Sequence, residues 1–151
     1  MDNQEIKRLR KLFIIEDNLV LKGYDIIAGV DEAGRGSLAG PIVAAAVILK
    51  KEDRLIEDLN DSKKLTPSKR EKVFNHIIES SYCYSVAKIS NQGIDNLSLG
   101  KANKIVLERA VLGLEKKPQI VLSDCFDIKC SCEVIPLIRG DMISASIAAA
   151  S

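Results

Sequence analysis

Residues 26–49 read IIAGVDEAGRGSLAGPIVAAAVIL, and this stretch decides which kind of fold we expect. Two apolar runs rich in β-branched residues, 26–30 and 42–49, predict two short buried strands, and the glycines between them break the pattern. Two adjacent carboxylates, Asp31 and Glu32, directly follow the first run. Burying a carboxylate is costly unless it is paired or bound to a metal, so this turn is a candidate functional site.

Apolar periodicity in the rest of the chain predicts an α/β fold, with a mixed β-sheet flanked by helices. Further strands are expected at 82–89, 119–123 and 132–136. Helices are expected at 3–21, from Thr66-Pro67 to Glu79, from Asn96 or Ser98 through Leu114, and from a cap at Asp141 to the end. The 151 residues, 46% of them hydrophobic, fit a single domain covering 1–151.

The sequence predicts neither a signal peptide at the N-terminus nor a membrane-spanning segment. The N-terminus lacks the basic start and apolar run of a signal peptide, and the longest apolar stretch, 40–49, is about half of a bilayer span. We therefore expect a soluble cytoplasmic domain without a membrane partner. The last helix has no stop signal before Ser151, which indicates a truncated piece of a longer protein.

Charge and residue inventory exclude several function classes. The net charge is +1, so no overall basic field attracts a polyanion, and the basic clusters at 7–11 and 63–72 also fit ordinary solvated helix faces. The sole histidine, His76, lies far from any nucleophile signature, which disfavours Ser-His and Cys-His catalysis. The cysteine spacing C-x4-C-x-C at 125–132 lacks the paired C-x2-C of a zinc site.

The glycines after the first predicted strand also match the pattern of a dinucleotide-binding domain, which is an alternative function. Gly34-x-Gly36-x-x-Ala39 matches the fingerprint G-x-G-x-x-A, and Asp53 follows at a suitable distance. That fingerprint must open a helix, whereas the apolar run after Pro41 suits a strand. Two carboxylates would also face the pyrophosphate, so this alternative is disfavoured.

Two more aspartates stand at the ends of expected elements. Asp124 follows the strand at 119–123, and Asp141 opens the last helix; alone, the first reads as a turn residue and the second as an N-cap. Together with Asp31 and Glu32 they could converge at one end of the sheet. Such a cluster repels itself unless divalent cations neutralise it, and oxygen ligands suit magnesium or manganese. Two such ions can flank a phosphodiester.

In these residues the chain resembles ribonuclease HII, the type 2 ribonuclease H. The matching blocks are 29–41, Asp61-Ser-Lys-Lys-Leu65, Gly93-Ile-Asp-Asn96 before a helix, and Gly140-Asp141 with Ser146–Ser151. The resemblance runs from about Ile26 to the last residue. It implies a ribonuclease H-like fold and an endoribonuclease that cuts the RNA strand of RNA–DNA hybrids, including single ribonucleotides embedded in DNA. Hydrolysis would use two metal ions and leave 5′-phosphate and 3′-hydroxyl ends.

The resemblance also implies roles for particular residues. The metal ligands would be Asp31, Glu32 and Asp124, with Asp141 as the fourth catalytic carboxylate; the substrate-binding residues would be Gly34, Arg35, Gly36 and Lys63. The cofactor would be manganese or magnesium, the partner an RNA–DNA hybrid and not a small-molecule cofactor, and the protein a monomer. The backbone of the glycine segment would meet the 2′-hydroxyl, which distinguishes RNA from DNA.

The chain departs from the family at two places. The family reads Val-Asp-Gly where this chain has Ser123-Asp124-Cys125, and it continues past Ser151 with a tyrosine that stacks below the junction nucleotide and with helices that grip the duplex. An inert fragment that binds hybrids without cutting them is therefore the second alternative.

Overall fold

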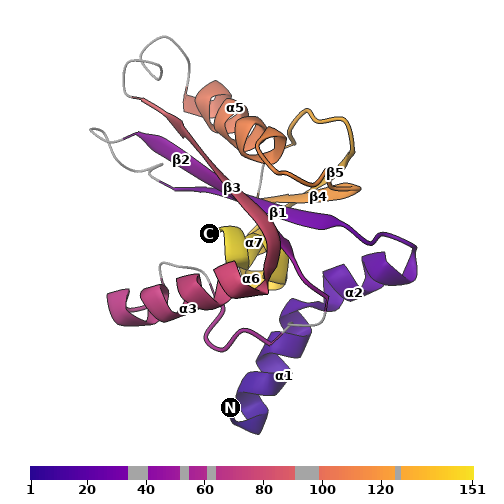
Figure 1. Ribbon diagram of the computed structural model, residues 1–151, viewed down its shortest axis with the longest axis vertical. Coiled ribbons are helices and arrows are strands. Elements are labelled where there is room, and N and C mark those ends of the chain that lie inside the picture. The colour runs from indigo at the N-terminus through magenta and orange to yellow at the C-terminus, as the bar shows by residue number, and fades with distance from the viewer. Residues whose placement is uncertain (34–40, 52–54, 61–63, 91–98, 125–126) are drawn as a thin grey trace.

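The computed structural model describes residues 1–33, 41–51, 55–60, 64–90, 99–124 and 127–151. In these residues a five-stranded sheet has the order β3-β2-β1-β4-β5 (Figure 1). Its strands are β1 (Ile27–Ala33), β2 (Ile42–Leu49), β3 (Ser81–Ile89), β4 (Ile120–Asp124) and β5 (Glu133–Leu137). β1, β2 and β3 pair antiparallel, while β4 runs parallel to both β1 and β5. The mixed sheet is thus confirmed.

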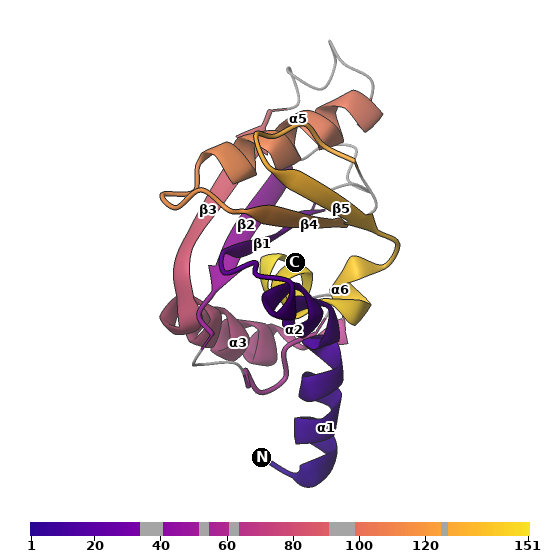
Figure 2. The same cartoon turned by 90° about the vertical axis from the view of Figure 1, so that its right-hand side faces the viewer.

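Helices cover both faces of this sheet, as Figure 2 shows. The described helices are α1 (Asn3–Leu12), α2 (Ile14–Leu21), α3 (Pro67–Ser80), α5 (Leu99–Leu112), α6 (Gly140–Ile143) and α7 (Ala145–Ala150). α5 packs on one face, where Ala28 and Val30 of β1 join its apolar cluster. α7 packs on the other face, where Ile27 of β1 meets Ile147. Successive residues of a strand point to opposite faces, so β1 supplies both cores.

The N-terminal segment is two helices, so the expectation of one helix over 3–21 is wrong. Phe13 stands between them with φ −94° and ψ 3°, and its amide donates back to the carbonyl oxygen of Arg10. Phe13 is 5% exposed and packs with Leu9 and Leu12 in a cluster that includes Ala148 of α7. The burial of Phe13 at the break is a tertiary contact, which periodicity along the segment does not reveal.

The end of the chain also differs from the expected single helix. Ser144 has the extended values φ −128° and ψ 125°, and it separates α6 from α7. Its Oγ accepts a hydrogen bond from the amide of Ile147 at 3.3 Å, so it caps α7. The sequence predicted Asp141 as the N-cap of the last helix, and this is wrong. Arg139 is the N-cap of α6, with φ 54°. No described helix has the length and apolar character needed to cross a bilayer.

Candidate metal-binding site

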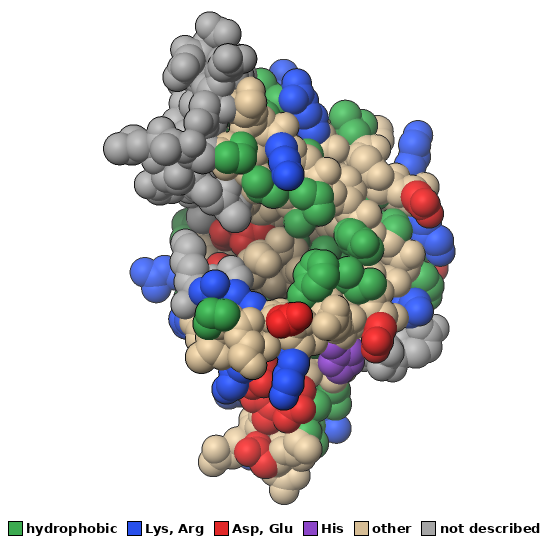
Figure 3. Space-filling model, turned by 60° about the vertical axis from the view of Figure 1, so that its left-hand side comes forward, with side chains coloured by type: hydrophobic (Ala, Val, Ile, Leu, Met, Phe, Trp, Pro, Cys, Tyr) green, Lys and Arg blue, Asp and Glu red, His purple; other side chains and the backbone are tan. Residues whose placement is uncertain are grey.

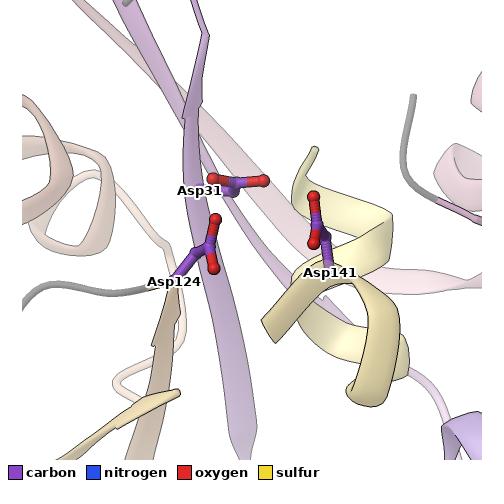
Figure 4. Close-up of side chains that lie close together, drawn as sticks. All are labelled: Asp31, Asp124 and Asp141. Atoms are coloured by element: carbon purple, nitrogen blue, oxygen red, sulfur yellow. The ribbon is translucent and has the colours of Figure 1, made fainter. Parts of the chain in front are cut away.

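Three carboxylates from three different elements meet at one end of the sheet. Asp31 comes from β1, Asp124 is the last residue of β4, and Asp141 lies in the first turn of α6. One oxygen of each lies within 4.8 Å of the others, and Figure 4 shows the three side chains turned toward one another. The sequence predicted that these acids converge, and the structure brings these three together.

The parallel pairing of β1 with β4 explains why Asp31 meets Asp124. In this register Gly29 stands opposite Leu122 and Val30 opposite Ser123, so the next position on each strand carries an aspartate. Ile27 and Ile120 pack in the cluster on the α7 side of the sheet. Because strand side chains alternate between faces, Asp31 and Asp124 belong to that same side.

Close contacts bring α6 and α7 against these strand ends. The amide of Gly140 donates to Asp124 Oδ1 at 2.9 Å, one residue before Asp141. A Cβ at Gly140 would lie 2.4 Å from Ile147 Cδ1, so the end of the Ile147 side chain would have to move to admit a side chain there. At Gly29 a Cβ would lie 2.1 Å from the carbonyl carbon and oxygen of Ser146, which means that α7 rests directly on the β1 backbone.

The site is acidic and partly closed. Asp31 is 5% exposed, and burial, followed by the negative charges of Asp124 and Glu32, raises its pKa to about 9. The amide of Glu32 donates to Asp31 Oδ1 at 2.8 Å, which opposes this shift. This shift favours the protonated form of Asp31 in the metal-free protein, and a bound cation would take the place of that proton. Figure 3 shows acidic side chains inside a hollow on this side of the molecule, with hydrophobic side chains beside it.

The donor set fits a hard divalent cation. It consists of carboxylate oxygens, the ligands that magnesium and manganese prefer. Two oxygens that share one magnesium ion at about 2.1 Å lie no more than about 4.2 Å apart. Oxygens already within 4.8 Å of one another reach that spacing through small side-chain rotations.

Glu32 occupies a different place from the three aspartates. β1 continues through both acids to Ala33, whereas the sequence predicted that this strand ends at residue 30. Regular alternation along this strand directs Glu32 toward the face opposite Asp31, and Glu32 is not part of the group of three. Its role as a metal ligand stays a prediction.

Other predicted site residues lie outside the described part of the chain; these are Gly34, Arg35, Gly36 and Lys63. The sequence analysis did not identify two residues that are important for the structure around the site, Gly29 and Glu16. Gly29 had a usable signal, because a glycine inside an apolar strand marks a close backbone approach. Glu16, which contacts Ser144 and Ser146, had none, since its partners lie far away in the sequence.

Comparison with known proteins identifies this arrangement. The fold matches that of the ribonuclease H2 from Pyrococcus horikoshii with a TM-score of 0.74 and 30% identity, over 83% of this chain and 68% of that one. The fold and its acidic site thus define a type 2 ribonuclease H. A family model described as Ribonuclease HII matches residues 28–151. The chain belongs to the ribonuclease HII family.

Individual relatives agree with this assignment and are longer than this chain. A ribonuclease HII from Caldicellulosiruptor saccharolyticus is 49% identical over 140 residues, which cover 92% of this chain and 68% of the relative. A ribonuclease HII from Ruminiclostridium cellulolyticum is 43% identical over 150 residues, which cover 99% of this chain and 58% of the relative.

Proposed function

We propose that this chain is an endoribonuclease that cleaves the RNA strand of RNA–DNA hybrids, including single ribonucleotides embedded in duplex DNA. The observation that carries the proposal is the meeting of Asp31, Asp124 and Asp141 in a chain of the ribonuclease HII family. The products would be 5′-phosphate and 3′-hydroxyl ends.

The carboxylates would hold magnesium or manganese at the end of the sheet. When bound there, two such ions would supply activation of a water molecule and charge stabilisation at the leaving oxygen of a phosphodiester. Asp31 must lose its proton before it can act as a ligand, because burial and the adjacent Asp124 hold that proton in place. The amide of Gly140 donates to Asp124 Oδ1, and this bond would help to hold Asp124 in a fixed orientation as a ligand.

The substrate contacts in this proposal come from the family resemblance. The backbone of Gly34, Arg35 and Gly36 would meet the 2′-hydroxyl and phosphate of the scissile ribonucleotide, and Lys63 would contact a neighbouring phosphate. Glu32 would be a further ligand, reached if the end of β1 turns toward the site.

The test uses a DNA duplex with one embedded ribonucleotide, end-labelled on that strand, incubated with manganese or magnesium. We expect one cut on the 5′ side of the ribonucleotide that Asp31→Asn abolishes, because the variant loses a ligand with little change in volume. Asp127→Asn, at an exposed aspartate three residues after Asp124 in the sequence, is the matched control and should cut normally. Equal cleavage by Asp31→Asn and the control would refute the site assignment.

An inert hybrid-binding fragment is the second candidate, because the chain spans only 58–68% of the two relatives above. It predicts that the folded chain retains the labelled hybrid in a gel-shift assay without cutting it. Cleavage by the chain would exclude this candidate.

A further inference from the structure

Glu16 on α2 is a buried carboxyl whose partners all lie near the end of the chain. It is 5% exposed, and its Oε2 accepts hydrogen bonds from the amide of Ser146 at 2.7 Å and from the hydroxyl of Ser144 at 3.0 Å. Its Oε1 is buried and has no hydrogen-bond partner among the described residues. Burial raises the pKa of Glu16, although both serines act against that shift. Such a group is expensive to bury.

The two serines stand at the junction between α6 and α7. Ser144 donates its hydroxyl hydrogen to Glu16 and accepts the amide of Ile147, so Glu16 fixes the direction of the hydroxyl that caps α7. Ser146 is also the residue whose backbone rests on Gly29 of β1. The start of α7 is thus held by β1 on one side and by Glu16 on the other.

The position of Asp141 depends on this junction. α6 has only four residues, too few for its own hydrogen bonds to hold it in place. Its orientation therefore depends on its neighbours, and these include the bond between Gly140 and Asp124 at one end, the junction at Ser144 at the other, and packing against α1.

We propose that Glu16 is a positioning residue for Asp141: by binding Ser144 and Ser146 it sets the α6–α7 junction and so keeps Asp141 opposite Asp31 and Asp124. The proposal rests on the proposed function of that site. Glu16 lies before residue 28, where the match to the family model begins, so the N-terminal helices would support a site to which they contribute no ligand.

Two substitutions separate hydrogen bonding from packing. Glu16→Gln keeps an oxygen that accepts from both serines, while Glu16→Leu keeps a similar volume and loses the acceptor. We expect Glu16→Gln to stay within about threefold of the wild type in manganese affinity, and Glu16→Leu to lose about tenfold, as for other groups that orient ligands. In cleavage assays kcat should fall in Glu16→Leu while KM stays unchanged. The accompanying change in Tm should be too small to account for the fall in kcat.

Glu108 provides the matched control. Its Oε1 accepts from the amide of Lys129 at 2.9 Å on the α5 side of the sheet. Glu108→Leu should leave manganese affinity, measured by titration calorimetry, unchanged. If Glu16→Leu does not fold, Ser144→Ala, which removes one of the two donors, should give a smaller loss of affinity. Wild-type affinity in the folded Leu variant, or equal losses in Glu16→Gln and Glu16→Leu, would overturn the proposal.

Amide hydrogen exchange distinguishes this proposal from the proposed function. If the wild type neither binds manganese nor cuts, the proposed function fails. In the metal-free chain Glu16→Leu should still speed exchange at Ser146 and Gly140, whereas Glu16→Gln should not. Unchanged exchange at Gly140 in Glu16→Leu would show that Glu16 does not act on α6, and the inference would then be wrong.

Discussion

The two faces of the sheet differ in the kinds of residue that they bury. Between α5 and the sheet lies a large apolar cluster that includes Val30, Val106 and Leu107, and the buried polar side chains on this side are those of Asn103 on α5 and Ser123 on β4. On the α7 face, apolar residues share the space with buried Glu16, Asp31, Ser144 and Ser146. Burying those groups adds little to stability unless each is hydrogen-bonded. The difference indicates that the α5 face contributes mainly stability, while the α7 face holds functional groups in position.

Gly29→Ala tests the α7 face most severely. The new Cβ would lie 2.1 Å from the Ser146 backbone, so α7 must leave β1. We expect a loss of about 4 kcal/mol in unfolding free energy, an unusually large value for one methyl group, together with loss of manganese binding. Denaturant titration and calorimetry measure the two effects.

Gly100→Ala on α5 is the control for that change. A Cβ at Gly100 meets nothing within 4 Å, and alanine favours the helix, so the variant should gain up to about 1 kcal/mol. If both glycine variants were equally stable, the tight contact between α7 and β1 would not exist.

Leu107→Ala tests the α5 face. Leu107 is fully buried in the apolar cluster, and its truncation should cost about 3 kcal/mol of unfolding free energy. Manganese affinity of the folded variant should remain unchanged, because the cluster lies across the sheet from the aspartates. Leu112→Ala, at a residue 79% exposed on the same helix, should alter stability by less than about 0.5 kcal/mol. A large loss of metal affinity in Leu107→Ala would mean that the two faces are not separate in function.

Asp31 should give the metal-free protein a distinctive pH dependence. The pKa of this carboxyl rises from 3.8 to about 9 on folding, so folding favours its protonated form. Its contribution to stability is therefore complete below about pH 4 and declines as the pH rises toward 9. Asp31→Asn removes this decline, so in the absence of metal the variant should be more stable than the wild type at pH 8.

Thermal unfolding across pH 5 to 9 in EDTA measures this effect, on a scale of about 1.4 kcal/mol for each pKa unit. Asp127→Asn should follow the wild-type curve. Parallel curves for the wild type and Asp31→Asn would show that Asp31 is ionised in the folded protein. Manganese should reverse the trend for the wild type, since the ion binds the deprotonated carboxyl.

The sequence predicted the elements better than it predicted their breaks. Apolar periodicity located the five strands and the helices α3 and α5, and the glycine-rich pattern after the first strand pointed to Asp31. The breaks at Phe13 and Ser144 depend on contacts across the fold, the first with a distant core cluster and the second with Glu16. Local periodicity does not reveal such distant partners. The two helices predicted at the ends of the chain are therefore four shorter helices in the structure, α1, α2, α6 and α7.

The continuation of β1 beyond residue 30 had a different cause. Antiparallel pairing with β2 extends to Ala33, whereas pairing with β4 stops at Val30. The sequence showed where the apolar run ended, and it could not show that a neighbouring strand extends the ladder through two charged residues. That extension leaves Asp31 on a fixed backbone at the point where β4 ends.

The parallel pairing of β1 with β4 also governs the order in which this molecule can assemble. Ile27 pairs with Ile120, and the third aspartate follows at position 141, so closing the site joins segments separated by most of the chain. Contacts of such long sequence separation form slowly, after the local helices and the antiparallel β1–β2 pair, whose strands follow each other closely in the sequence. During synthesis the cation site cannot exist until Asp141 has left the ribosome. A divalent ion bound at this site would therefore stabilise the completed fold by mass action, and would not direct the early steps that lead to it.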